Sequence, residues 1–497
     1  MRTLGYLLIW FMFTTSNLCA YAQGLVAGIS RSRPNVLLIV VDDLRPELGM
    51  YGEPQIVSPN IDRLAERGQL FTHTYANFPS CAPSRIALLS GLYDSRNRFK
   101  YWNSSQDHDV PGLVSLPMHF RNNGYKTISL GKVYNNFGDG KGSWDEEWRP
   151  PTTTTRGGWD YQTENGIEIF RKVNSQREKS LKIRNKNNLP RKSLPFEKAD
   201  VSDVTYKDGK TASKAIEELE SLKQSSQPFF LAIGFKKPHL PFNAPRRYWK
   251  LYDQPDIKLP ENSFKPKGAP DISVTTNSGE LRAFYGVPNQ GPIPDSLARQ
   301  LIQGYDACVS FMDKQVGRVL NELELLGLDN DTIVVLTADH GFQLGEHGLW
   351  GKHTNYLVSL HIPLIIRVPG KQTNVRQNDL ISQVDIYPTL CDLAGLSKPF
   401  HLQGKSFAGQ INNPKLDGRK EVYYHFRGAE TIITKTHSYT EFFNQKGKQI
   451  ANMLYDLRDD PGENTNIAKK AANKQLIKKL GDQLSVHMKN RDNISLK

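Results

Sequence analysis

Five short runs of β-branched and other apolar residues recur along the chain, with helical patterns between them. They are 35–41, 127–132, 227–235, 332–337 and 363–370. Continuous apolar runs of this length are typical of strands that are buried on both faces, as in a parallel sheet. Strands that alternate with helical segments predict a three-layer α/β domain, with helices on both faces of the sheet. At 497 residues the chain is long enough for additional layers or subdomains.

Carboxylates follow two of these runs directly. Asp42 and Asp43 end the first run, and Asp339 and His340 end the fourth. Open α/β sheets place ligands at the carboxyl ends of their strands. Adjacent acids repel one another unless a cation neutralises them, so a hard divalent metal is the functional interpretation. A solvated strand end is the alternative.

Basic side chains follow the other strands. Lys132 ends the second run, His239 lies between two prolines after the third, and Lys352 lies on a glycine-rich loop after the fourth. If the sheet is parallel, all of these groups meet at one edge. Acids for a cation and lysines for an anion indicate a hard-metal and polyanion site, and argue against a zinc–thiolate site.

Cys81 lies in a Pro/Ser-rich segment before an apolar run. Pro83 is expected to interrupt regular structure, and Ser84 is a good N-cap for a helix that follows. This places Cys81 on a loop that leads into a helix N-terminus, where backbone N–H groups favour an anion. The alternative is an ordinary buried cysteine, because cysteine is often packed as a small apolar residue.

The segment Cys81-x-Pro83-Ser84-Arg85, followed by Leu89-Ser90-Gly91, resembles the signature of type I sulfatases. Further motifs match that family in the same order, and they look most like its iduronate-2-sulfatase branch. They are Asp42-Asp43, Gly131-Lys132-Val133-Tyr134, Lys237-Pro238-His239, Asp339-His340-Gly341, Gly345-Glu346-His347-Gly348, Gly351-Lys352 and, near the C-terminus, Leu454-Tyr455-Asp456-Leu457 with Asp460-Pro461 and Asn466.

The resemblance implies an alkaline phosphatase-like three-layer sandwich with a large mixed, mostly parallel sheet and a small C-terminal α+β subdomain. It also implies that a separate maturation enzyme oxidises Cys81 to formylglycine. The hydrated aldehyde would attack sulfur with one oxygen and then expel sulfate with the other, which is covalent catalysis. Ca²⁺ would neutralise charge. The implied metal ligands are Asp42, Asp43, Asp339, His340 and the residue derived from Cys81.

The resemblance also assigns the other catalytic roles. Arg85 would steady the diol, Lys132 and Lys352 would bind sulfate oxygens, and His239 would protonate the leaving oxygen. Asn135 stands where the family usually has a histidine. An amide can form hydrogen bonds but cannot take up a proton. We expect activity to persist, with another base such as Asp339 serving or with slower turnover.

The implied substrate is a sulfated sugar or oligosaccharide, such as a uronate 2-sulfate or a marine polysaccharide like ulvan. Arg98, Tyr101, Trp102 and Lys237 are candidates for the sugar subsite, and the alternative is that they are surface and packing residues. The formal net charge of +13 suits an acidic partner, or it reflects a solvated basic surface.

Two other functions compete with this one. Related enzymes of the same superfamily hydrolyse phosphonate or phosphate esters, whose shape is similar to that of sulfate esters. The missing histidine at Asn135 leaves room for a non-catalytic protein that binds sulfated glycans. Of these three functions, we expect that of a sulfatase. We expect neither a nucleic-acid partner nor a membrane span.

The N-terminus resembles a secretory signal. Arg2 precedes the apolar stretch 4–13, and Ala20-Tyr21-Ala22 forms a cleavage pattern. We expect a signal peptide over 1–22, a catalytic domain over 23–407, a subdomain over 408–497, and a periplasmic or secreted product. Cleavage would leave three cysteines, and an odd number leaves at least one unpaired.

Overall fold

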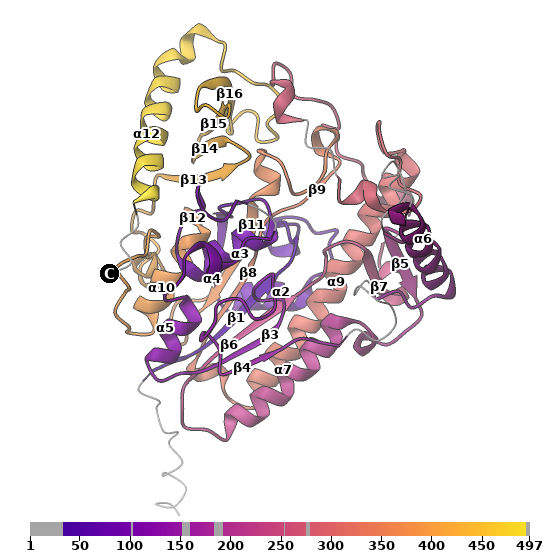
Figure 1. Cartoon of the computed structure of the whole chain (residues 1–497). Coiled ribbons are helices and arrows are strands. Elements are labelled where there is room, and N and C mark those ends of the chain that lie inside the picture. Colours follow the sequence, from indigo (N-terminus) through magenta and orange to yellow (C-terminus); the bar gives the residue numbers. More distant parts are fainter. Residues whose placement is uncertain are drawn as a thin grey trace, which may run out of the picture.

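The computed structural model describes residues 33–100, 103–151, 160–182, 192–252, 254–274 and 279–493. Its central sheet has eight strands in the order β12-β2-β11-β8-β1-β6-β3-β4 (Figure 1). All neighbours are parallel except β11, which is antiparallel to β2 and β8. The strands are β1 (Asn35–Val41), β2 (Gln69–Tyr75), β3 (Lys126–Gly131), β4 (Glu146–Trp148), β6 (Phe229–Phe235), β8 (Thr332–Ala338), β11 (His361–Arg367) and β12 (Val375–Ser382).

Helices cover both faces of this sheet because the side chains of its central strand are apolar on both faces. Leu37, Ile39 and Val41 of β1 belong to one core, whereas Val36 and Leu38 belong to another, and all are fully buried. The first core contains α2 (Pro59–Glu66), α7 (Lys207–Lys223) and α9 (Asp295–Leu325). The second contains α3 (Cys81–Ser90), α5 (Leu116–Asn122) and α10 (Ile386–Leu393). The predicted three-layer, mostly parallel architecture is confirmed.

A second sheet lies beside the C-terminal helix (Figure 1). It is antiparallel and consists of β13 (Glu421–Phe426), β14 (Ala429–Thr434), β15 (His437–Phe443) and β16 (Gln449–Asp456). Leu480 and Leu484 of α12 (Lys474–Asp492) pack with Ile432, Tyr439 and Leu454 of this sheet. The predicted antiparallel C-terminal sheet is confirmed.

The remaining elements are short or peripheral. They are α4 (Gln106–Asp109), α6 (Glu164–Lys182), α8 (Arg246–Trp249), α11 (Ala408–Asn412), the strand pair β5 (Phe196–Ala199) and β7 (Phe242–Pro245), and the strand pair β9 (Gln343–Leu344) and β10 (Trp350–Gly351). Among the described helices, none combines the length and apolar character that a membrane crossing requires.

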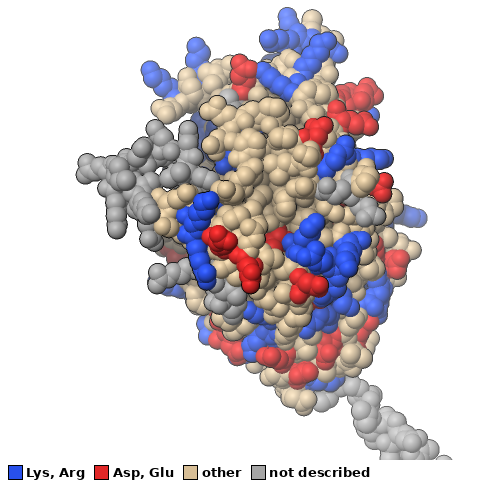
Figure 2. All heavy atoms as spheres, turned by 90° about the vertical axis from the view of Figure 1, so that its right-hand side faces the viewer, with Lys and Arg blue, Asp and Glu red and all other residues tan. Residues whose placement is uncertain are grey.

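Within the irregular, basic stretch 140–199 of the sequence, residues 164–182 form the helix α6. Its many charged residues hide the apolar periodicity that would mark a helix in the sequence. On the face turned towards the viewer in Figure 2, Lys and Arg side chains lie among Asp and Glu. The positive charge of this face is therefore interrupted by acids.

The start of α3 also differs from the prediction. The helix begins at Cys81 itself, with Ser80 as its N-cap, so Ser84 lies inside the helix. Pro83 is accommodated because the first-turn N–H groups of a helix have no intrahelical acceptor. The Ser84 hydroxyl instead lies within hydrogen-bond distance of Gln383 Oε1, at 2.7 Å, and of the carbonyl of Asp339. Ser84 thus ties α3 to the end of β8.

Candidate active site

Four parallel strands bring their carboxyl ends to one edge of the sheet. Val41 of β1 lies opposite Phe235 of β6 and Ala338 of β8, and Gly131 of β3 lies opposite Gly234. The residues that follow these positions therefore meet above the sheet, beside the N-terminus of α3. The predicted convergence of strand ends is confirmed.

Cys81 lies at the centre of this cluster. Its Sγ is 3.3 Å from His340 Nε2 and 3.4 Å from Lys352 Nζ, and the residue is 8% exposed. Burial, assisted by the charge of Asp42, raises the pKa of the thiol well above its usual range, although Lys132 and Lys352 oppose this shift. Because the thiolate is the reactive form of cysteine, the encoded side chain is a poor nucleophile in this environment.

Three fully buried carboxylates lie next to Cys81. They belong to Asp42, Asp43 and Asp339. Asp43 has a positive φ of 64°, and its carbonyl accepts a 2.8 Å hydrogen bond from Tyr305, which holds the strained turn after β1. Burial, and after it the neighbouring Asp42, raise the pKa of Asp43, whereas Lys352 lowers it. Burial therefore disfavours the fully ionised form of this carboxylate cluster.

These residues fit a hard divalent cation. Ligand atoms of Asp42, Cys81, Asp339 and His340 lie within 4.8 Å of one another. Asp43 Oδ2 is buried and has no hydrogen-bond partner among the described residues. Coordination of a metal ion would account for such an unpaired buried oxygen. Carboxylate oxygens favour Ca²⁺ or Mg²⁺ over softer metals.

Arg85 links the strand ends beneath the cluster. Its Nε is 2.9 Å from Asp339 Oδ2, and one terminal nitrogen is 3.4 Å from Asp42 Oδ1. The other terminal nitrogen donates to the carbonyl of Val133 at 3.1 Å and to that of Lys132. The guanidinium is fully buried. It thereby fixes α3 against the ends of β1, β3 and β8.

Two lysines approach the cluster from different strands. Lys132 Nζ lies 2.7 Å from Asp42 Oδ2, and Lys352 Nζ lies 2.9 Å from Asp43 Oδ1. Although burial lowers the pKa of Lys352, Asp43 and other acids raise it well above the usual value, so the ammonium form is favoured. The site therefore holds two permanent cations close to Cys81.

His239 lies on the loop after β6, which contains two cis peptide bonds, Lys237–Pro238 and Leu240–Pro241. Its Nδ1 is 2.5 Å from the carbonyl of Leu240. A carbonyl only accepts, so Nδ1 carries a proton there and Nε2 is the nitrogen left for other chemistry. Burial and then Lys352 lower the pKa of His239, whereas Glu280 and Asp42 raise it.

Glu280 is a site residue that the sequence analysis missed. Its carboxylate contacts Lys352 Nζ at 3.3 Å, His239 Nε2 at 3.4 Å and Lys192 Nζ at 3.3 Å. Despite burial, these three side chains hold the pKa of Glu280 well below its usual range. Glu280 follows no apolar strand and belongs to none of the motifs above, so no sequence signal distinguished it.

The structure gives two predicted subsite residues a different environment. Arg98 donates to the carbonyls of Tyr93 and Arg491 at 2.8 and 2.7 Å, so it anchors the end of α12. Lys237 Nζ donates to the carbonyls of His239 and Pro241 and so braces the loop that carries His239. Both side chains thus have structural contacts with backbone carbonyls, and their role in the sugar subsite stays a prediction.

Three other predicted residues remain. Asn135 lies in the turn after β3, where its side chain donates to Asn136 at 3.4 Å and its carbonyl accepts from Arg149 at 3.2 Å. Tyr101 and Trp102 lie outside the described residues, as does the expected signal segment 1–22. Cys81, Cys308 and Cys391 are all free and buried, so the expectation of an unpaired thiol is confirmed for the described chain.

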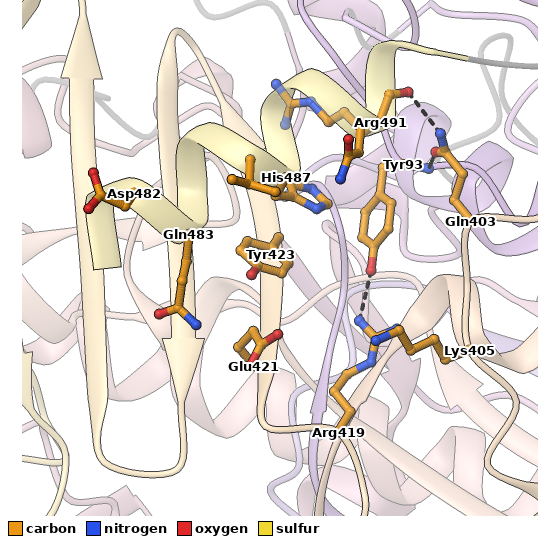
Figure 3. Close-up of a pocket in the computed structure, with 12 residues that line it drawn as sticks. Tyr93, Gln403, Lys405, Arg419, Glu421, Tyr423, Asp482, Gln483, His487 and Arg491 are labelled. Atoms are coloured by element: carbon orange, nitrogen blue, oxygen red, sulfur yellow. Dashed lines mark hydrogen bonds between the residues drawn. The ribbon is translucent and has the colours of Figure 1, made fainter. Parts of the chain in front are cut away.

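A cavity of about 620 Å³ lies elsewhere, between α12 and β13 (Figure 3). Its walls include Tyr93, Arg419, Tyr423, His487 and Arg491. None of the residues predicted to bind metal or perform catalysis lines this cavity. Cavity size therefore does not mark the active site, which is recognised by its chemistry.

Known proteins resemble this chain over most of its length. The family model described as sulfatase matches residues 34–396, and the model for the C-terminal region of N-sulphoglucosamine sulphohydrolase matches residues 345–490. Iduronate 2-sulfatase from Homo sapiens is 34% identical over 459 residues, which span 84% of this chain and 79% of that protein.

The chain belongs to the sulfatase family. It is accordingly a hydrolase that acts on sulfuric esters.

Solved structures support the fold of this sulfatase. The structure of BT4656 in complex with its substrate D-glucosamine-2-N,6-O-disulfate has a TM-score of 0.73 at 23% identity, and the match covers 93% of this chain and 98% of that one. The phosphonate monoester hydrolase of Agrobacterium radiobacter has a TM-score of 0.71 at 23% identity, covering 92% and 96% of the two chains. These likenesses establish an alkaline phosphatase-like α/β fold. The fold alone does not separate sulfate from phosphonate esters.

Proposed function

We propose that this sulfatase removes a 2-sulfate group from a uronate in a sulfated oligosaccharide, with formylglycine at position 81 and Ca²⁺ as its resident metal. One observation carries the proposal. Cys81, the first residue of α3, lies in contact with both His340 and Lys352, beside three buried carboxylates. An unmodified neutral thiol has no evident use among these groups.

Formylglycine would supply a hydrated aldehyde as the oxygen nucleophile. Ca²⁺ would supply positive charge for the nucleophile and the sulfate oxygens. The ligands would be Asp42, Asp43, Asp339 and His340, together with an oxygen at position 81 in place of Cys81 Sγ.

Lys132 and Lys352 would hold the sulfate oxygens on either side of position 81. In the structure their ammonium groups contact Asp42 and Asp43, so each is already oriented by a buried carboxylate. Fixed cations in a site of low dielectric stabilise the negative charge that develops during ester cleavage. Arg85, bonded to Asp339 and Asp42, would keep the base of the site rigid.

His239 would donate the proton to the departing sugar oxygen. Its Nδ1 is committed to the Leu240 carbonyl, so Nε2 would carry the transferred proton. Asn135 would serve at most as a hydrogen-bonding group, because an amide cannot exchange a proton with the substrate.

The 2-sulfated uronate rests on the iduronate 2-sulfatase relative, which is 34% identical and aligned over most of both chains. We also infer export after removal of residues 1–22, with the catalytic domain over 23–407 and the subdomain over 408–497. Formylglycine would be installed by a separate maturation enzyme.

The test is a panel of disaccharides that differ only in sulfate position. The matured enzyme is expected to release sulfate from a 2-sulfated uronate at least about tenfold faster in kcat/KM than from the isomer sulfated on the hexosamine, since a misplaced ester loses alignment with the site. A preference for the hexosamine isomer would contradict the assigned substrate. A matched aryl sulfate and aryl phosphate pair tests the competing phosphoesterase function, which predicts faster hydrolysis of the phosphate.

A further inference from the structure

Glu280 places a carboxylate among the groups expected to bind sulfate. Its Oε2 is 3.3 Å from Lys352 Nζ, and that same ammonium is 3.4 Å from Cys81 Sγ. Its Oε1 is 3.4 Å from His239 Nε2 and 3.3 Å from Lys192 Nζ. One side chain thus separates Glu280 from the nucleophile position.

A carboxylate and a sulfate group make the same kinds of contact, because both accept charge-assisted hydrogen bonds from ammonium and imidazolium groups. Lys352 cannot give the same donor fully to Glu280 and to a sulfate ester, and the same holds for His239 when its Nε2 is protonated. Glu280 is also a further carboxylate near the cluster, where its negative charge raises the pKa of Asp43, and like charges repel more strongly when they are partly buried.

The side chain of Glu280 can leave this position. It is 23% exposed, whereas the side chains of Asp42, Asp43 and Asp339 are fully buried. The residue lies just before the short turn Leu281–Ala283, where Leu281 is buried and anchors the backbone. A fixed backbone with a partly exposed side chain suits a carboxylate that exchanges with an incoming anion.

We propose that Glu280 is an internal competitor of sulfate, which occupies Lys352 and His239 between turnovers and promotes departure of the sulfate product. The proposal rests on the proposed function, in which these two residues bind the ester. A site with two lysines and a divalent cation would otherwise retain a dianionic product. Glu280 weakens the binding of that product, because its negative charge repels sulfate and because it competes for the same hydrogen-bond donors.

Equilibrium binding of inorganic sulfate tests the proposal without requiring turnover. Calorimetric titration of the full-length, Ca²⁺-loaded protein is expected to show about tenfold tighter sulfate binding for Glu280→Gln than for the wild type, because the variant removes one adjacent negative charge. Glu280→Asp keeps the charge and is expected to bind sulfate as weakly as the wild type. Glu217→Gln, on the exposed surface of α7, is the matched control.

Steady-state kinetics gives the second measurement. Product inhibition by sulfate is expected to strengthen by the same factor in Glu280→Gln. If Glu280 merely positions His239, Glu280→Gln will lose kcat/KM with unchanged sulfate affinity, and that result overturns the proposal. Thermal unfolding of each variant, with Glu280→Ala as a second neutral substitution, checks that the fold is intact. A wild type that releases no sulfate from any ester refutes the proposed function instead, and leaves the binding comparison as the test of Glu280.

Discussion

The charged side chains around Cys81 form contacts between groups of opposite charge. Lys132 contacts Asp42, Lys352 contacts Asp43, and Arg85 lies between Asp42 and Asp339. Each carboxylate is thereby oriented, and each cation is kept charged in a buried site. Burying so many charged groups costs folding free energy that their pairing only partly offsets. This indicates that they serve binding and catalysis more than stability.

Lys352→Ala tests this arrangement at the nucleophile. We expect kcat for sulfate ester hydrolysis to fall by about 10²–10³, because one fixed cation that faces the developing charge is removed. Steady-state kinetics on an aryl sulfate measures the effect. Lys478→Ala on the exposed face of α12 is the matched control. A drop of less than about threefold in Lys352→Ala would remove Lys352 from the catalytic group.

Removal of the divalent metal tests the carboxylate cluster. Dialysis against EDTA is expected to abolish sulfate release and to lower the melting temperature, because the three buried carboxylates lose the cation that neutralises them. Added Ca²⁺ should restore both properties. Differential scanning fluorimetry and a sulfate-release assay follow them in parallel, and full activity after exhaustive chelation would contradict a metal role.

The strand ends position the site because two glycines let β3 and β6 approach closely. A Cβ on Gly234 would lie 1.9 Å from the carbonyl oxygen of Lys132, and one on Gly131, at φ 74°, would lie 2.3 Å from the carbonyl oxygen of Gly234. Only glycine fits where two backbones come this close. The position of Lys132 thus depends on glycines that have no reactive side chain.

Gly234→Ala tests that geometry. The added methyl group meets backbone, which cannot move aside, so we expect about 1–3 kcal/mol of destabilisation and reduced kcat/KM as Lys132 is displaced. Urea unfolding and kinetics provide the measurements. Gly409→Ala in α11, where the new methyl group makes only an ordinary contact at 3.5 Å, should leave both properties near the wild-type values.

Much of this edge was predictable from the sequence. Buried apolar runs predicted β1, β3, β6 and β8, and parallel pairing then required the residues after them to converge. β2 was missed because its polar residues break the apolar run, and α6 because its charged residues mask its periodicity. Glu280 and the actual contacts of Arg98 depend on tertiary packing between segments far apart in the sequence, for which no local pattern exists.

Across the whole molecule, the C-terminal sheet supports the loop that carries Lys352. Tyr424 donates to the carbonyl of Asn355 at 2.7 Å, and Glu463 accepts from the backbone N–H of Leu357 at 2.7 Å. The ring of His353 stacks on Phe426 with centroids 6.0 Å apart. The position of Lys352 therefore depends on contacts between its loop and the C-terminal region.

The protonation of Glu463 makes the stability of the fold depend on pH. Burial raises its pKa from 4.5 to about 8. A carboxyl group with a raised pKa in the folded state stabilises the fold at low pH, and that contribution is lost as pH rises from about 4.5 through about 8. The wild type should therefore lose stability over this range relative to Glu463→Gln, which remains neutral. Urea unfolding at pH 5 and pH 8 measures the difference, and parallel pH profiles would contradict it.

We propose that the residue at position 81 acts only after conversion of its CH₂SH group to an aldehyde. The most direct measurement combines peptide mass spectrometry of the segment that contains Cys81 with sulfate release, on samples expressed with graded amounts of a formylglycine-generating enzyme. Specific activity is expected to rise in proportion to the converted fraction and to be absent from Cys81→Ala. Activity in fully unconverted protein, or in Cys81→Ala, would contradict it.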